Sequence, residues 1–167
     1  RTETLVDIAF WITLLGNWYF VVTLSIASSA IFLLWNKKIH ALFLWLAIGG
    51  SGLLNFLVKT VYRRERPASG VYFEEYFSFP SGHANIGIVL YGFLAYVAWK
   101  HARKGWQKIT ALVAFMVVAF SIGLSRVFLN VHYASDVLGG FLLGGLWLSL
   151  VIIFLERFSD ARAHNEL

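Results

Sequence analysis

A histidine and an aspartate four residues apart are the most informative pair in the sequence. His132 and Asp136 would share one face of a helix. The carboxylate can then accept the proton of one ring nitrogen and leave the other nitrogen free as a nucleophile. A second histidine, His83, follows Pro-Ser-Gly and is a candidate general acid. These residues predict nucleophilic catalysis by a histidine.

Cationic side chains near these histidines predict what is attacked. Lys59, Arg66 and Arg126 can surround a tetrahedral oxyanion, since an arginine forks onto two oxygens. Ser81 and Gly82 stand where a helix is predicted to begin, and backbone N–H groups at a helix start bind anions. The whole set predicts a phosphoryl-transfer site that needs no metal.

The composition indicates a membrane protein. Of 167 residues, 59% are hydrophobic and 14% are charged, whereas a soluble domain carries about 25% charged residues. A core of this size cannot hide so much apolar surface from water. The absence of cysteine excludes a thiolate nucleophile and disulfides. The formal charge of +5 favours anionic headgroups or phosphorylated substrates. Nucleic acid is not expected, because the cations form no continuous stripe.

Charge-free runs predict an all-α, polytopic transmembrane helix bundle. Five spans are expected at about 18–35, 41–59, 82–99, 108–126 and 135–156. Gly16-Asn17 interrupts the first run, so an interfacial helix is predicted at about 4–15. Residues 1–167 are interpreted as a single transmembrane domain, with a sixth span expected upstream of residue 1. Glycine pairs in the spans suit close helix packing: Gly49-Gly50 with Gly52, Gly139-Gly140, and Gly144-Gly145.

The connections between the spans predict an orientation in the cell membrane. Lysine and arginine are concentrated in 36–40, in 100–108 and after residue 156, which the positive-inside rule places in the cytoplasm. The connections 60–81 and 127–134 then lie on the extracytoplasmic face. The candidate residues close two spans and open two others, so all of them are expected at that face.

Each group alone has a simpler interpretation. Taken alone, the basic cluster Arg63-Arg64-x-Arg66 could be an ordinary headgroup anchor, and Arg64 itself is a candidate for headgroup binding. Ser81 could serve only as a helix N-cap. Glu74 and Glu75 are interpreted as solvated loop residues. The coincidence of the other groups at one face is what favours a catalytic site.

Three motifs resemble a known family. Lys59-x6-Arg66-Pro67, Pro80-Ser81-Gly82-His83 and Ser125-Arg126-x5-His132-x3-Asp136 resemble the three signature motifs of type 2 phosphatidic acid phosphatases, in order and with full spacing. The resemblance implies six membrane helices and no metal or cofactor. It implies that His132 forms a phosphohistidine, that Asp136 orients it, and that His83 protonates the leaving oxygen and later activates water. Phosphate binding is implied for Lys59, Arg66, Ser81, Gly82 and Arg126.

The small size and short connections resemble the bacterial members of the family that convert phosphatidylglycerophosphate to phosphatidylglycerol. The alternative substrate is undecaprenyl pyrophosphate, the carrier lipid of cell-wall synthesis. The expected partners are an anionic phosphorylated lipid and membrane lipids, without an obligatory protein partner. A channel or transporter would need polar residues at membrane depth, and Asn55 and Ser121 are about the only candidates. Vanadium haloperoxidases share the motifs, but they are larger and soluble.

Overall fold

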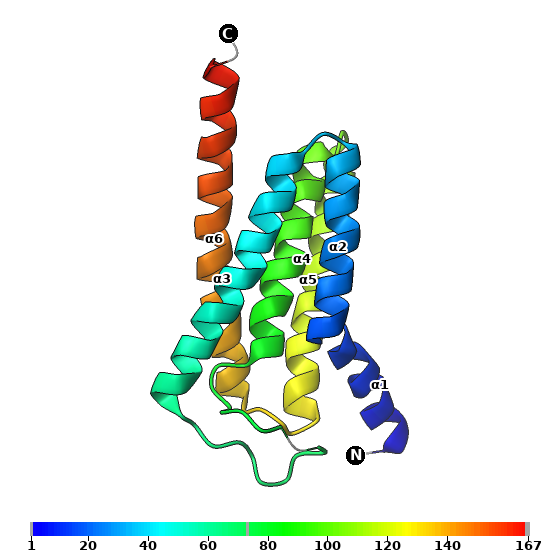
Figure 1. Cartoon of the computed structure of the whole chain (residues 1–167). Coiled ribbons are helices and arrows are strands. Elements are labelled where there is room, and N and C mark those ends of the chain that lie inside the picture. Colours follow the sequence, from blue (N-terminus) through cyan, green and yellow to red (C-terminus); the bar gives the residue numbers. More distant parts are fainter. Residues whose placement is uncertain (1, 73, 166–167) are drawn as a thin grey trace.

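The computed structural model describes residues 2–72 and 74–165. These residues form helices joined by loops, with no strand among them. The six helices are α1 (Glu3–Leu14), α2 (Trp18–Leu34), α3 (Lys38–Tyr62), α4 (Gly82–His101), α5 (Gly105–Phe128) and α6 (Ala134–Asn165). Helices α2 to α6 run up and down in one bundle, and the short α1 lies obliquely at the end of α2 (Figure 1). The predicted all-α membrane bundle is confirmed.

Four helices, α3 to α6, are long and apolar enough to cross a membrane. The helices α1 and α2 meet this test together, as one span bent by 45° at a short break. The predicted interruption at Gly16-Asn17 is therefore correct, and the structure has four spans, or five if the bent pair is one span. The interfacial position of residues 4–15 and a separate span at 18–35 stay predictions. Asn17 begins α2 by accepting a hydrogen bond from the Tyr19 N–H at 3.0 Å. The sixth span upstream of residue 1 stays a prediction.

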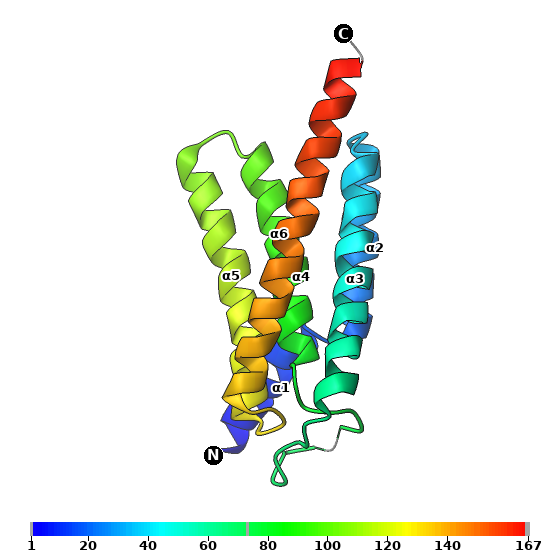
Figure 2. The same cartoon turned by 90° about the vertical axis from the view of Figure 1, so that its left-hand side faces the viewer.

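Helix α4 is the axis of the bundle. In its most apolar stretch 56% of the residues are buried, against 28–33% in α3, α5 and α6. Val89, Leu90 and Phe93 are fully buried. In the two views α4 lies among its neighbours rather than at the rim (Figures 1 and 2). The N-terminus of α4, which carries the Pro-Ser-Gly-His motif, is therefore central at its end of the bundle.

Two glycines let α6 lie directly on the first turns of α4. A Cβ at Gly140 would be 2.5 Å from the Ser81 carbonyl oxygen, and one at Gly144 would be 2.6 Å from that of Asn85. Small residues of this kind allow close backbone contact in lipid. Gly50 and Gly139 also face side chains, but Gly49, Gly52 and Gly145 have nothing within 4 Å, so the predicted packing role is wrong for those three.

Polar side chains inside the bundle are more numerous than the sequence analysis expected. Asn85 is buried in α4, and its amide donates to the Ser51 hydroxyl in α3 at 2.8 Å. Ser25 and Ser28 in α2 are also buried. The expectation that Asn55 and Ser121 are about the only polar residues at depth is therefore wrong. Asn85 lies on the turn of α4 that follows the motif, so these polar contacts fix the helix that carries His83.

The motif residues gather at one end of the bundle. Helices α3 and α5 end there, and α4 and α6 begin there, as the alternation of spans predicted. The long connection 63–81 closes this end, beside the short turn 129–133 (Figure 1). Arg63 ends α3 in a left-handed conformation with φ 45°, and its N–H bonds the Lys59 carbonyl oxygen.

Candidate active site

His132 and Asp136 are paired, although not along a helix. His132 lies in the turn before α6, and Asp136 lies in the first turn of α6. The predicted shared helix face is therefore wrong in detail. His132 Nδ1 is 3.4 Å from Asp136 Oδ2, with His132 only 2% exposed and Asp136 fully buried. The turn itself holds the carboxylate, because the Tyr133 N–H donates to Oδ2 at 2.9 Å.

Two residues that the sequence analysis gave no part in the catalytic site also bind Asp136. The Ser78 hydroxyl donates to Oδ2 and lies 3.3 Å from His132 Nδ1. Arg64 Nη1 donates to Oδ1 at 2.8 Å and to the Ser135 hydroxyl at 2.7 Å. Arg64, expected at a lipid headgroup, thus supports the aspartate in the structure. Both carboxylate oxygens of Asp136 are satisfied, which fixes the orientation of His132.

The opposite nitrogen of His132 faces the cations. Arg66 Nη1 lies 3.1 Å from His132 Nε2. An arginine can only donate, so Nε2 is the unprotonated nitrogen and Nδ1 carries the proton toward Asp136. Burial lowers the pKa of His132 below its ordinary value, and Arg66, Arg126 and Lys59 lower it further, against the opposing hydrogen bond to Asp136. The lowered pKa favours the neutral form of His132, in which the lone pair of Nε2 points toward Arg66.

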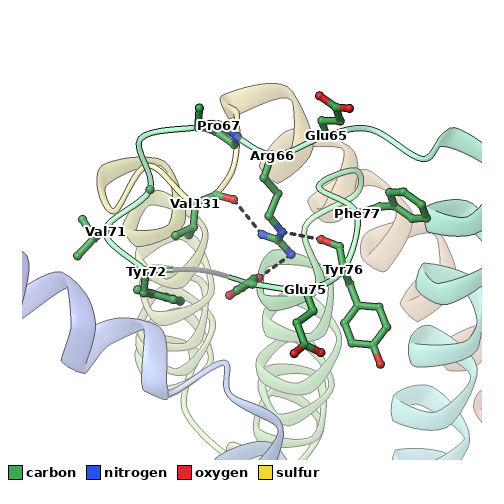
Figure 3. A pocket seen from close by; sticks show the side chains of 12 residues that line it. Glu65, Arg66, Pro67, Val71, Tyr72, Glu75, Tyr76, Phe77 and Val131 are labelled. Carbon is green, nitrogen blue, oxygen red and sulfur yellow. Dashed lines mark hydrogen bonds and ion pairs between the residues drawn. The ribbon is translucent and has the colours of Figure 1, made fainter.

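Arg66 is held by backbone oxygens of both loops. Its Nη1 donates to the Val131 carbonyl at 2.9 Å, and its Nε donates to the Tyr76 carbonyl at 2.6 Å. Figure 3 shows the guanidinium reaching from the connection 63–81 between these two carbonyls. Lys59, at the end of α3, donates to the Phe77 carbonyl. The loops thus orient two of the predicted phosphate-binding cations.

Arg126 is fully buried in the last turn of α5. Its guanidinium donates to the Thr13 hydroxyl in α1 at 2.8 Å, to the Tyr72 hydroxyl and to Glu74. Its Nε has no hydrogen-bond partner among the described residues. A buried guanidinium is costly unless it is paired, so the Glu74 carboxylate is a large part of what keeps Arg126 inside.

Glu74 is not the solvated loop residue that the sequence analysis expected. Its Oε2 lies 2.6 Å from Arg66 Nη2, and its Oε1 pairs with Arg126. Oε2 is also 4.0 Å from His132 Nε2. Burial alone would raise the pKa of Glu74, but Arg126 and Arg66 outweigh it and hold that pKa below its ordinary value. Glu75, its neighbour, is exposed as expected.

A cavity of about 270 Å³ joins the predicted residues. Of the eight, it is lined by Lys59, Arg66, Gly82, His83 and His132, together with Glu74. Arg126 contacts the lining residue Glu74, and Asp136 contacts the lining residue His132. Ser81 is buried as the N-cap of α4; its hydroxyl accepts from the Ala84 N–H and its own N–H donates to the Asp136 carbonyl at 2.9 Å. The structure thus brings seven of the eight to the cavity or its immediate wall, and gives Ser81 a capping position.

Two further cavities adjoin this one. A cavity of about 650 Å³ within the loops shares Arg66, Glu74 and Tyr76 with it (Figure 3). A third, of about 350 Å³, is bordered by residues of α2, α3 and α4 and shares Asn55 and His83 with it, as well as two glycines. The catalytic histidine candidates therefore stand between a loop cavity and a cavity among apolar helices.

The sequence is matched by the profile of the PAP2 superfamily over residues 40–160. That range contains every motif residue described above. The chain therefore belongs to the PAP2 superfamily, and within it to the multi-pass membrane lipid phosphatases, which are phosphoric monoester hydrolases.

The chain is also similar to individual proteins and to solved structures. Over 165 residues the chain is 35% identical to phosphatidylglycerophosphatase B of Bacillus subtilis (strain 168), covering 97% of this chain and 81% of that protein. It is similar, with a TM-score of 0.89 and 35% identity, to a crystal structure of a transmembrane PAP2 type phosphatidylglycerolphosphate phosphatase from Bacillus subtilis, over 94% of this chain and 79% of that one. The crystal structure of Aquifex aeolicus LpxE matches with a TM-score of 0.72 and 26% identity, over 91% and 87%.

Proposed function

We propose that this protein removes the terminal phosphate of phosphatidylglycerophosphate through a phosphohistidine on His132. The observation that carries the proposal is the arrangement of the His132 ring. Nδ1 is bound on the side of Asp136, while Nε2 faces Arg66 in the cavity. An oriented imidazole whose unprotonated nitrogen faces cations has the properties of a nucleophile toward a phosphate ester.

The first step forms the phosphohistidine. Lys59, Arg66 and Arg126 bind the three outer phosphoryl oxygens and stabilise their charge in the transition state. Nε2 of His132 bonds to phosphorus as the bond from phosphorus to the lipid oxygen breaks. His83, which lines the same cavity, donates a proton to that oxygen and releases the lipid alcohol.

The second step restores the enzyme. The now neutral His83 accepts a proton from a water molecule, whose oxygen attacks phosphorus. The bond between phosphorus and His132 Nε2 breaks, and inorganic phosphate leaves. Asp136 stabilises the proton on Nδ1 throughout, and the proposed cycle uses no metal ion or cofactor.

The surroundings of the cavity support a lipid substrate. The cavity that shares Asn55 and His83 with the site is otherwise lined mainly by apolar residues, among them Val21, Val22 and Ile48. A lipid could hold its phosphate at His132 and its chain among α2, α3 and α4. Phosphatidylglycerophosphate is the favoured substrate because similar proteins are named for removal of its phosphate. This chain matches those proteins over most of their length.

We propose that the site faces outward from the cell membrane. The opposite end of the bundle carries Lys37, Lys38 and Lys100, in keeping with the positive-inside rule. Because the chain contains no cysteine, Glu75→Cys gives a single labelling site beside the cavity. A maleimide that does not cross membranes should label it in intact cells, and labelling only after lysis would contradict this orientation.

The test of the function is phosphate release by detergent-purified protein in EDTA. Phosphatidylglycerophosphate and undecaprenyl pyrophosphate are compared at equal mole fraction in mixed micelles. Faster release from phosphatidylglycerophosphate is expected, and a clear preference for undecaprenyl pyrophosphate would replace the proposed substrate. Absence of release from every lipid phosphate, with folded protein, would overturn the proposed function.

A further inference from the structure

Glu74 pairs with two of the three cations that are proposed to bind the phosphate of a substrate. Each of its carboxylate oxygens is taken by a different arginine, Arg66 or Arg126. Arginine forks match a carboxylate and a phosphate by the same geometry, so one anion excludes the other. Oε2 lies 4.0 Å from the nucleophile candidate His132 Nε2, close to the separation at which phosphorus would be attacked, about 3–3.5 Å.

The neighbouring carboxylate shows that this position is specific. Glu75 has the same charge and lies on the same connection, but its side chain is exposed. Glu74 and Arg66 line both the loop cavity and the site cavity, so the carboxylate lies where the two cavities meet.

A membrane enzyme with a cationic phosphate site faces a particular competitor. The lipids that surround it are mostly phosphodiesters, each with one negative charge on phosphorus, at concentrations far above that of any monoester. Lys59, Arg66 and Arg126 would attract those monoanions. An internal carboxylate opposes this, because exchange of one monoanion for another gains no charge, while a monoester dianion gains one.

We propose that Glu74 is an internal anion that occupies the two-arginine site and weakens the binding of every competing anion, so that membrane phosphodiesters do not fill the site while a phosphomonoester dianion displaces the carboxylate. This inference rests on the proposed function for its biological meaning. Its physical content, competition between Glu74 and a bound anion, concerns only Arg66 and Arg126.

The test measures anion binding to detergent-purified protein by isothermal titration calorimetry at pH 8. The probes are inorganic phosphate, mainly a dianion there, and dimethyl phosphate, a monoanion without a lipid chain. Glu74→Gln keeps the shape of the side chain and removes its charge. It should bind both probes about tenfold more tightly than the wild type, since loss of a charge-assisted pair frees both arginines. Glu75→Gln is the matched control and should bind as the wild type does.

A second readout uses the lipid itself. Turnover of Glu74→Gln should fall as phosphatidylglycerol is added to the micelles at constant substrate mole fraction, while the wild type changes little. Glu74→Asp keeps the charge but is one methylene shorter, so its anion affinity should fall between those of the wild type and Glu74→Gln. It also serves if the glutamine variant does not fold.

Unchanged or weaker phosphate binding by folded Glu74→Gln would overturn the inference, because the carboxylate would then only position the arginines. The proposed function fails by a different result, the absence of phosphate release from lipid monoesters by the wild type. The binding measurement does not depend on turnover, so the two failures are distinguishable.

Discussion

The two ends of the bundle contain similar residue types in different states. At the active-site end, Arg126 and Asp136 are fully buried, and Nε2 of His132 remains open to a cavity. At the opposite end, Lys100 and Glu156 form an ion pair whose side chains are 46% and 34% exposed. The rings of His40 and His101 pack edge to face there, with their centroids 5.9 Å apart. His101 Nδ1 also forms a hydrogen bond with the Val97 carbonyl oxygen at 2.8 Å.

The difference shows what turns charged residues into a site. The exposed end satisfies its charges in water, where an ion pair contributes about 0–1 kcal/mol. The active-site end withdraws them from water, so each charge depends on a fixed partner, and a bound phosphate is stabilised more strongly. Substitution of matched residues at the two ends should therefore have very different effects.

The largest difference is expected for the histidines. His132→Gln should lower kcat by about 10⁴-fold or more, because it removes the proposed nucleophile. His101→Gln at the other end should leave kcat within about twofold. The measurement is phosphate release with matched circular dichroism spectra. Comparable losses from both variants would remove the contrast between the ends.

The second-largest difference in kcat is expected between the acidic residues of the two ends, Asp136 and Glu156. Asp136→Asn loses the carboxylate that fixes the His132 tautomer, and the corresponding change in a serine-protease triad costs about 10⁴-fold in kcat. We expect a loss of about 10³-fold, since Ser78 still reaches His132 Nδ1. Glu156→Gln should change kcat little. Near wild-type turnover of Asp136→Asn would contradict an orienting role for this residue.

The basic residues of the two ends, Arg126 and Lys100, should contribute very differently to the free energy of unfolding. Arg126→Ala leaves Glu74 without one of its two arginines and opens a buried space, so it should lower the free energy of unfolding by about 3–5 kcal/mol. Lys100→Ala should lower it by at most about 1 kcal/mol. Thermal unfolding in a single detergent measures both, and equal shifts in Tm would contradict the difference in burial.

The smallest effect is a displacement of the pH profile. The nucleophile must be neutral and the acid protonated, so a bell-shaped rate is expected. Because burial and the cations lower the pKa of His132, the acidic limb should lie below the ordinary histidine pKa, and activity should be lost only as pH falls through that lowered value. Arg66→Gln removes a charge that lowers this pKa, so the limb should move to higher pH. A flat profile from pH 5 to 9 would contradict the scheme.

The sequence was sufficient for the parts that depend on periodicity and alternation. Charge-free runs located the helices, and the alternation of spans brought Lys59, His83 and His132 to one end. The break at Gly16-Asn17 was also predictable, because a glycine followed by an N-cap residue interrupts a helix.

The connection 63–81 was not predictable in the same way. It has no periodic pattern, and its contacts are with residues far along the chain: Arg64 with Asp136, Ser78 with His132, and Glu74 with Arg126. Glu74 and Glu75 are identical in type, and only the folded loop distinguishes the partly buried, arginine-paired one from the exposed one. One signal was available: a site with several buried cations requires a nearby anion when no substrate is bound.

The most direct test of the central assignment is to trap the covalent intermediate. A ³²P-labelled phosphoester is mixed with the His83→Gln variant. Because this substrate has a good leaving group, the first step needs no general acid. The variant lacks the residue proposed to activate water, so the second step should be slow. After an alkaline quench, label should be found on His132, stable to base and lost in acid, and absent from His83→Gln/His132→Gln. Label that persists when His132 is replaced, or that lies on another residue, would contradict the account.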